Sequence, residues 1–416
     1  MKLFKTSALN GIAVLIKTAT MFILNKILAV YVGPSGYALI GQFQNFIQMV
    51  TVFSGNAINT AVVKYTAEYY EQPEKQRTIW QTATGIIFFF SLVGGGLIFL
   101  LREKLSVVIF NNSDYESVFI WFAVFLLFFN LNTLFLAILN GKKAIERLVA
   151  ANISGSLISL AITAVLVIEF GLYGALVALA IYQSLAFFIT FFICNQASWF
   201  SWKELFGNLD KGIARKFASF ALMAVVSAVC VPVSQMVIRQ YLSYEYGNEY
   251  AGYWEAMVRF SGAYLMLVTT TLGVYYLPRL SELKEVDKIK QEIFLAYKYI
   301  FPLALLGGVT VFILKDWIII TLFSDKFLPM RELFFWQILG DIVKIGSWIL
   351  AYLMLSKAMT KLFVITEVVF SISSVLLSIL FVNLIGFEGV SLAHLINYTL
   401  YLMVVGLFIF KVLNKL

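Results

Sequence analysis

The chain has 416 residues, of which 61% are hydrophobic and only 13% charged, and its mean hydropathy is +0.87. Soluble domains carry about twice that share of charged residues, so the composition excludes a soluble globular protein and predicts an all-α polytopic membrane protein. The net charge of +8 does not indicate nucleic-acid binding, because the aromatic residues lie in apolar runs and not between basic residues of a soluble domain.

Apolar runs of about 20 residues, long enough to cross about 30 Å of hydrocarbon as helices, recur along the whole chain. They are too long and too apolar to be the alternating strands of a membrane barrel. We predict twelve transmembrane helices, at residues 8–30, 37–60, 80–101, 117–140, 148–169, 172–194, 217–238, 251–273, 294–314, 332–356, 361–384 and 388–411.

The distribution of basic residues predicts the orientation of these spans. Lys and Arg accumulate in the cytoplasmic loops of membrane proteins. Here they concentrate in the segments that are inside when the N-terminus is inside, for example Lys142, Lys143 and Arg147, and we assign Arg239 to the sparser outer segments. Because the number of spans is even, both termini are predicted to be cytoplasmic.

The longest stretch without a strong apolar run, residues 195–216, divides the predicted spans six and six. Residues 24–76 and 238–290 share a few identities at a constant offset, which is a weak sign of an internal repeat. Transporters are commonly built from duplicated bundles with the ligand site at the repeat interface. We therefore predict two pseudo-symmetric six-helix lobes, 1–200 and 201–416, around a central cavity.

Two lysines interrupt the first predicted span. Lys17 and Lys26 are nine positions apart, so at about 100° per residue they point to roughly opposite sides of a helix. Lys26 is close enough to the outer surface for its ammonium to reach water along the membrane interface. Lys17 is deeper, and we predict that it faces the cavity.

Five amide side chains of the second predicted span lie within about 120° of arc: Gln42, Asn45, Gln48, Asn56 and Asn59. Interhelical polar contacts in membranes average only about 0.6 kcal/mol, so packing alone does not require so many. A water-exposed helix face with many hydrogen-bond donors and acceptors suits a hydroxyl-rich ligand such as a sugar. The alternative is a polar seam between two helices.

Later spans carry further polar candidates. Glu255 and Arg259 are four positions apart, the spacing of a helical ion pair, so Arg259 is predicted either to meet a substrate phosphate or to be neutralised by Glu255. Glu367 is a candidate for ion coupling, or is solvated near the inner end of its span. His394 is predicted to be a hydrogen-bonded packing residue in preference to a proton carrier.

The tenth predicted span, 332–356, places an acid and a base inside a membrane helix. Gln337, Asp341 and Lys344 share one polar and aromatic face. A charge at bilayer depth costs about 2.5 to 3.5 kcal/mol on insertion scales, so these groups must face one another, a partner helix or water. They indicate a cavity with a possible ion-coupling role for Asp341, and the alternative is an internal salt bridge that only locks the helix in place.

The residues within the spans also exclude several functions. Their charges are balanced to slightly cationic, which favours an anionic passenger over a cationic drug. The chain has no GxxxxGK[ST] phosphate loop, no HExxH or other metal spacing and no nucleophile-base-acid arrangement. We therefore expect no enzyme, no metal and no cofactor.

Several segments resemble one family over essentially the whole chain, in order. The most specific pattern is WQxxGDxxK, formed by Trp336, Gln337, Gly340, Asp341 and Lys344. The family is that of the Wzx flippases, above all the branch of lipid III flippases and O-antigen translocases. The segments that carry the resemblance are VGPSG (32–36), VKYTAEYY (63–70), YYLPRLSEL (275–283), SDKFLPMRELFFWQILGDIVKIGSW (324–348) and AYLMLSKAMTKLFVITE (351–367).

The resemblance implies a fold and a function. The fold is that of the multidrug, oligosaccharidyl-lipid and polysaccharide exporter superfamily, in which two lobes alternate between inward and outward openings. The function is to turn an undecaprenyl-pyrophosphate-linked oligosaccharide from the inner to the outer leaflet of the bacterial inner membrane, with a polysaccharide polymerase and a chain-length regulator as possible partners. Lys17, Lys26, Asp341 and Lys344 match the family, whereas Arg259 belongs to no pattern of that branch.

From these observations we hypothesise that Lys17, Lys344 and Arg259 hold the pyrophosphate, that the amide row reads hydroxyls, and that Asp341 alternately pairs with Lys344 or releases it. Two alternatives stay open: a cation-coupled multidrug exporter of the same superfamily, and an assembly factor of a polysaccharide polymerase that transports nothing. A lipid II flippase is disfavoured, because it usually has fourteen spans.

Overall fold

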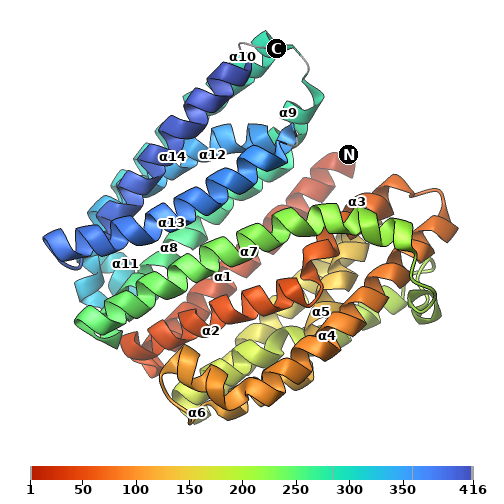
Figure 1. The fold of residues 1–416 in the computed structure, drawn as a ribbon, viewed down its shortest axis with the longest axis horizontal. Helices are drawn as coiled ribbons and strands as arrows, with labels where there is room; N and C mark the ends of the chain where they lie inside the picture. Colours follow the sequence, from red (N-terminus) through yellow and green to blue (C-terminus); the bar gives the residue numbers. More distant parts are fainter. Residues whose placement is uncertain (1, 284, 358, 414–416) are drawn as a thin grey trace. The chain divides into compact units, whose positions relative to one another are not determined.

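The computed structural model describes residues 2–283, 285–357 and 359–413, and within these ranges the chain is helical almost throughout, with no strand (Figure 1). Long apolar stretches fold as helices because a membrane offers no water to satisfy free backbone N–H and C=O groups. The α-helices are α1 (Lys2–Tyr31), α2 (Gly33–Phe53), α3 (Asn59–Glu68), α4 (Pro73–Phe110), α5 (Glu116–Gly141), α6 (Ile145–Asn195), α7 (Lys211–Tyr246), α8 (Asn248–Thr271), α9 (Leu277–Glu282), α10 (Val286–Ile313), α11 (Lys315–Leu322), α12 (Phe334–Ser356), α13 (Thr360–Ile385) and α14 (Gly389–Leu413). Short 3-10 or π turns are η1 (Asn56–Ile58), η2 (Trp202–Leu205), η3 (Leu272–Tyr276) and η4 (Asp325–Leu333).

The twelve predicted spans lie on these helices. Among the described residues, eight helices are individually long and apolar enough to cross a membrane, or nine if the bent pair that begins with α2 is one span. One of the eight is α6, whose 51 residues exceed twice the length that a span needs. It contains a break at Gly171 (φ 56°, ψ −131°), between the predicted spans 148–169 and 172–194. The chain is therefore a polytopic all-α membrane protein.

The second predicted span is not one helix. α2 ends at Phe53, and Gly55 adopts φ 131°, a conformation that L side chains rarely adopt. The following pair η1 and α3 leaves at 67° to α2. The prediction of one continuous amide row from Gln42 to Asn59 is therefore wrong, because Asn56 and Asn59 lie beyond the bend.

The seventh predicted span ends too early. α7 continues to Tyr246, eight residues past the predicted limit at 238. Arg239 therefore lies within the helix with only 1% of its surface exposed, and its assignment to an outer loop is wrong. Its burial must be compensated by a partner of opposite charge, which is described below.

The chain forms two compact units. Unit 1 comprises 1–32 and 39–232, and unit 2 comprises 33–38 and 233–416. The division lies inside α7, later than the boundary near residue 200 that the sequence predicts for the two lobes, and that boundary stays a prediction. Only the first residues of α2 belong to unit 2.

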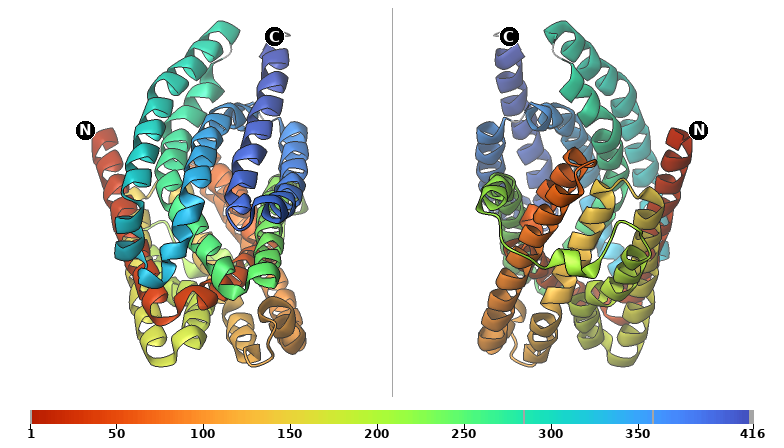
Figure 2. Two further views of the ribbon diagram at one scale, coloured as in Figure 1. Left: turned by 90° about the vertical axis from the view of Figure 1, so that its left-hand side faces the viewer. Right: turned by 90° about the vertical axis from the view of Figure 1, so that its right-hand side faces the viewer.

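Unit 1 is built around α5, which packs against α4, α6 and α3. Its buried core includes Leu131, Phe135 and Ile138 of α5 and Trp80 of α4. The connection between α6 and α7, which includes η2, lies against α4 (Figure 2). This connection brings residues near 200 back to the end of the unit where α3 and α4 meet.

Unit 2 is built around α12, which packs against α14, α10 and α8. Its buried core includes Leu272, Ile349 and Val405. Two glycines permit close helix approach: a Cβ at Gly252 of α8 would lie 1.8 Å from the Pro34 carbonyl oxygen at the start of α2, and a Cβ at Gly340 of α12 would lie 2.5 Å from His394 Cδ2 of α14. The second approach shapes the candidate site.

Candidate functional site

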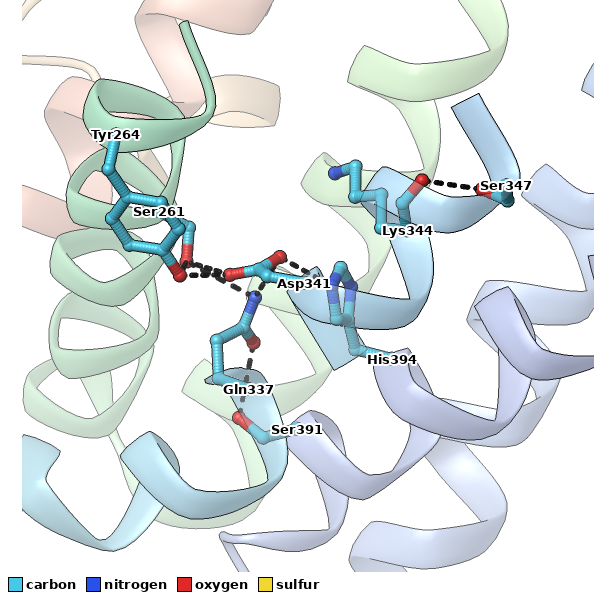
Figure 3. A network of polar contacts seen from close by, with 8 residues as sticks. All are labelled: Ser261, Tyr264, Gln337, Asp341, Lys344, Ser347, Ser391 and His394. Atoms are coloured by element: carbon cyan, nitrogen blue, oxygen red, sulfur yellow. Dashed lines mark hydrogen bonds and ion pairs between the residues drawn. The ribbon is translucent and has the colours of Figure 1, made fainter. Parts of the chain in front are cut away.

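The Asp341 carboxylate lies at the centre of a polar network in unit 2, and only 1% of the residue is exposed (Figure 3). Ser261 Oγ donates a hydrogen bond to Oδ2 at 2.7 Å, and the Tyr264 hydroxyl donates to the same oxygen. His394 Nε2 donates to Oδ1 at 2.9 Å. Because a carboxylate accepts and does not donate, this contact places the histidine proton on Nε2.

Gln337 connects this carboxylate to a third hydroxyl, that of Ser391. Its Nε2 lies 3.5 Å from Asp341 Oδ1 and 3.4 Å from Ser261 Oγ, and its Oε1 accepts from Ser391 Oγ at 3.4 Å (Figure 3). The network therefore joins α8, α12 and α14 through side chains alone. Buried hydrogen bonds to a charged group offset the cost of removing it from water.

Helical periodicity brings the members of the network together. Gln337 and Asp341 are four positions apart on α12, while the α8 pair Ser261 and Tyr264 and the α14 pair Ser391 and His394 are each three apart. Residues at these spacings share one face of a helix. The absence of a side chain at Gly340 allows α14 to approach closely enough for His394 to reach the carboxylate.

Lys344 has a different environment from the one predicted. Its ammonium lies 4.7 Å from the ring centroid of Tyr398 and 5.2 Å from that of Trp348. Within the described part of the chain, no ion pair joins it to Asp341, whose ion-pair partner is His394. The predicted Asp341–Lys344 salt bridge is therefore absent from this conformation.

A second buried ionic group of unit 2 contains Arg259. Glu255 Oε1 accepts from Arg259 Nε at 2.6 Å, as the four-residue spacing predicts, and Oε2 accepts from Arg239 Nη2 at 2.5 Å. The Arg259 guanidinium also lies 5.2 Å from the Tyr37 ring, and that of Arg239 lies 5.5 Å from the Trp254 ring. One carboxylate thus holds two arginines, and the group has a net positive charge.

Unit 1 holds the remaining predicted residues in differing environments. Lys17 of α1 and Gln48 of α2 are exposed, whereas Gln42 and Asn45 are 8% and 6% exposed. Asn45 Nδ2 donates to the Pro232 carbonyl at 3.5 Å, which is a packing contact. Past the bend, Asn56 Oδ1 accepts from Thr133 Oγ1 at 2.5 Å and from Asn59 Nδ2 at 3.3 Å. Of the amide row, Gln48 alone is exposed.

Sequence reasoning missed four members of these groups: Arg239, Ser261, Tyr264 and Ser391. It recognised His394 as a hydrogen-bonded residue but not its carboxylate partner. A usable signal was present, because Ser261 with Tyr264 and Ser391 with His394 form polar pairs three residues apart within apolar spans. No local pattern distinguishes Arg239 from an arginine in a loop. Its position depends on where α7 ends.

The chemistry available to these groups is binding and proton or ion exchange. Among the described residues, no cluster of three or more His, Cys, Asp and Glu side chains could hold a metal ion. Asp341 and His394 can exchange a proton with each other, and the arginine pair and Lys344 carry positive charge.

The chain is similar to known proteins over most of its length. A family model described as "Polysaccharide biosynthesis protein" matches residues 3–284. The chain is 30% identical to the lipid III flippase of Escherichia coli (strain K12) over 368 residues, which is 88% of this chain and 88% of that protein. The lipid III flippase of Shigella flexneri matches with the same identity and coverage.

Solved structures of low sequence identity share the fold. A multidrug resistance MATE family transporter of the MOP superfamily, in an inward-facing conformation, has a TM-score of 0.78 at 13% identity, over 96% of this chain and 95% of that one. The lipid II flippase MurJ, in an inward closed conformation, has a TM-score of 0.70 at 16% identity, over 97% of this chain and 86% of that one. These two structures support the MATE-like fold that the sequence predicts.

Proposed function

The chain belongs to the polysaccharide biosynthesis protein family and to the lipid III flippase group within it, and on that basis we propose that it turns an undecaprenyl-pyrophosphate-linked oligosaccharide from the inner to the outer leaflet of the bacterial inner membrane. The observation that carries this proposal is the 30% identity to a lipid III flippase over 88% of both chains. The oligosaccharide is an O-antigen repeat unit or that of lipid III.

The physical task fits a membrane protein with polar groups inside its spans. A pyrophosphate-sugar head group cannot cross hydrocarbon unaided, because desolvating its charges costs far more than thermal energy supplies. Its apolar tail can remain in the hydrocarbon of the bilayer. The protein therefore needs to shelter the head group alone, and binding and release suffice without a catalysed reaction, so we assign the chain no enzymatic step and no cofactor.

Each unit contributes candidate head-group contacts. In unit 2, Lys344 and Arg259 supply positive charge to phosphate oxygens, and the ring contacts of both cations replace part of their hydration. In unit 1, the exposed Lys17 takes the same role, and the exposed Gln48 amide hydrogen-bonds sugar hydroxyls. Gln42, Asn45, Asn56 and Asn59 contribute through packing in this conformation. Asp341 couples movement to an ion by gaining and losing a proton, and Glu367 is a second candidate for coupling.

The orientation follows from the basic residues of the loops, with both termini cytoplasmic. A polysaccharide polymerase and a chain-length regulator are the partner proteins that the proposed pathway position implies. A cation-coupled drug exporter is less well supported, because the buried groups of unit 2 include two arginines and a lysine against few carboxylates.

Complementation tests the function directly. A strain that lacks its lipid III flippase and its O-antigen flippase, and expresses this chain, should recover one of the two surface glycans on immunoblots. The same strain should show no gain of resistance to cationic dyes. Recovery of neither glycan by a protein that is inserted and abundant, or dye resistance without glycan, would contradict the proposal.

A further inference from the structure

Four lysines of unit 1 lie over aromatic rings. The residues are Lys64, Lys75, Lys142 and Lys216, with Tyr65, Tyr69, Tyr70 and Trp199, and we call them the basic-aromatic cluster. They come from α3, α4, α7 and the connections that follow α3, α5 and α6. Segments far apart in the sequence thus supply the same chemical pair, an ammonium and a ring.

The centre of the cluster is a stacked pair of tyrosines. The rings of Tyr65 and Tyr69 have centroids 6.4 Å apart at an angle of 15°. Lys216 lies 5.4 Å from the first ring and 6.0 Å from the second, while Lys64 and Lys75 each lie 5.1 Å from one of them. Three ammonium groups therefore share two rings, and their mutual repulsion falls when an anion binds between them.

Lys142 extends the cluster from a partly buried position. Its ammonium lies 5.1 Å from both the Tyr70 and the Trp199 rings and donates to Gln76 Oε1 at 2.9 Å. Burial lowers the pKa of Lys142 below the usual lysine range, and the nearby Glu204 opposes that change. Burial thus reduces the hydration of the Lys142 ammonium, and an added anion would favour its charged form.

A buried scaffold holds Lys142 in place. Gln76 is 1% exposed and donates through Nε2 to the Thr66 carbonyl at 2.6 Å, and Trp80 Nε1 donates to Thr66 Oγ1 at 3.1 Å. Gly141 precedes Lys142, and a Cβ there would lie 2.6 Å from Thr66 Cβ. The close approach of α5 to α3 therefore fixes the position of Lys142, so this part of the cluster is preorganised.

Two carboxylates of this region bind an arginine. Glu74 and Glu204 both ion-pair with Arg77, at 3.0 and 2.9 Å. Lysine ammoniums are compact charges that suit phosphate oxygens, and tyrosine and tryptophan rings lie preferentially at the level of lipid head groups. Clusters of basic residues beside a cytoplasmic membrane surface attract anionic lipids.

We propose that the basic-aromatic cluster binds the phosphate or pyrophosphate group of an anionic membrane lipid at the head-group level. Two lipids carry this chemistry: a bulk phospholipid such as phosphatidylglycerol, and the pyrophosphate carrier of the substrate, which would then dock here before entering the protein. The second source rests on the proposed function, whereas the first does not.

Lipid binding to the purified full chain tests this proposal. Native mass spectrometry in detergent would measure dissociation constants for phosphatidylglycerol, undecaprenyl pyrophosphate and neutral phosphatidylcholine. A Lys64→Ala/Lys216→Ala variant should bind at least one of the two anionic lipids about 25-fold more weakly, about fivefold for each lysine, with binding of the neutral lipid unchanged. A Lys64→Arg/Lys216→Arg variant keeps the charge and should retain most of the affinity.

Lys315→Ala is the matched control, because Lys315 of α11 also lies over a ring, 4.2 Å from that of Phe312, but outside the cluster. It should leave all three constants unchanged. A loss confined to phosphatidylglycerol would identify a phospholipid site, and a loss confined to undecaprenyl pyrophosphate would identify a substrate-docking site. Equal anionic-lipid binding by the alanine double variant and the wild type would overturn the proposal. Because no transport is measured, this outcome is independent of whether the chain flips a lipid.

Discussion

Asp341 and His394 are hydrogen-bonded at 2.9 Å, from α12 to α14, in a region where the sequence predicted a pair between Asp341 and Lys344. The contact changes the role of the acid. Asp341 is held by its neighbours in this conformation, and Lys344 lies over the rings of Trp348 and Tyr398. An acid and an imidazole in contact form a pair that can store one proton.

Removing the imidazole should weaken both stability and transport. His394→Ala leaves a buried carboxylate with one donor fewer, which costs about 1 to 3 kcal/mol. His394→Gln can still offer an N–H to Oδ1 and should retain more stability than His394→Ala. Thermal unfolding in detergent would rank the two variants. Equal melting temperatures for both variants and the wild type would show that the contact contributes nothing.

Gly340, which precedes Asp341, should not tolerate substitution by alanine. In Gly340→Ala the new Cβ would lie 2.5 Å from His394 Cδ2 and 3.1 Å from the backbone of Leu395, so α14 must shift. Overpacking of this kind costs about 1 to 3 kcal/mol. Gly346→Ala on the same helix is the control, because its nearest atom is Tyr297 Cε1 at an ordinary 3.5 Å. Melting temperatures should fall for the first and stay within about a degree or two for the second.

Because Glu255 binds two arginines, substitution of Glu255 should destabilise the protein more than substitution of Arg259. Glu255→Ala removes one carboxylate from two buried guanidiniums, and breaking a buried pair in this way costs about 3 to 5 kcal/mol. Arg259→Ala leaves Glu255 bound to Arg239 and should cost less. The yield of folded, monodisperse protein and its melting temperature would test this order. The reverse order would mean that Arg239 does not need the acid.

How much the sequence predicts depends on the range of the interactions. The helices follow from apolar runs, and the Glu255–Arg259 pair follows from a four-residue spacing, because both are local. The network around Asp341 joins residues 53 to 80 positions apart and depends on how α8, α12 and α14 pack, which no local pattern specifies.

The two errors of helix boundary have causes that the composition concealed. Ser54 and Gly55 end α2 inside an apolar stretch that continues on both sides, and the bend depends on a single positive φ. α7 runs past Arg239 because a distant carboxylate on α8 compensates the charge. An arginine in lipid has a high free-energy cost, so a span predicted from the sequence alone ends before Arg239.

The most direct measurement of the central claim is flipping by the purified chain. Proteoliposomes would contain a fluorescent undecaprenyl-pyrophosphate oligosaccharide, and a membrane-impermeant reductant would report the fraction in the outer leaflet over time. The wild type should equilibrate the two leaflets, Lys344→Ala should lower the rate at least tenfold while remaining inserted and folded, and Lys344→Arg should keep a measurable rate. Wild-type vesicles no faster than protein-free vesicles, or full activity of Lys344→Ala, would contradict the account.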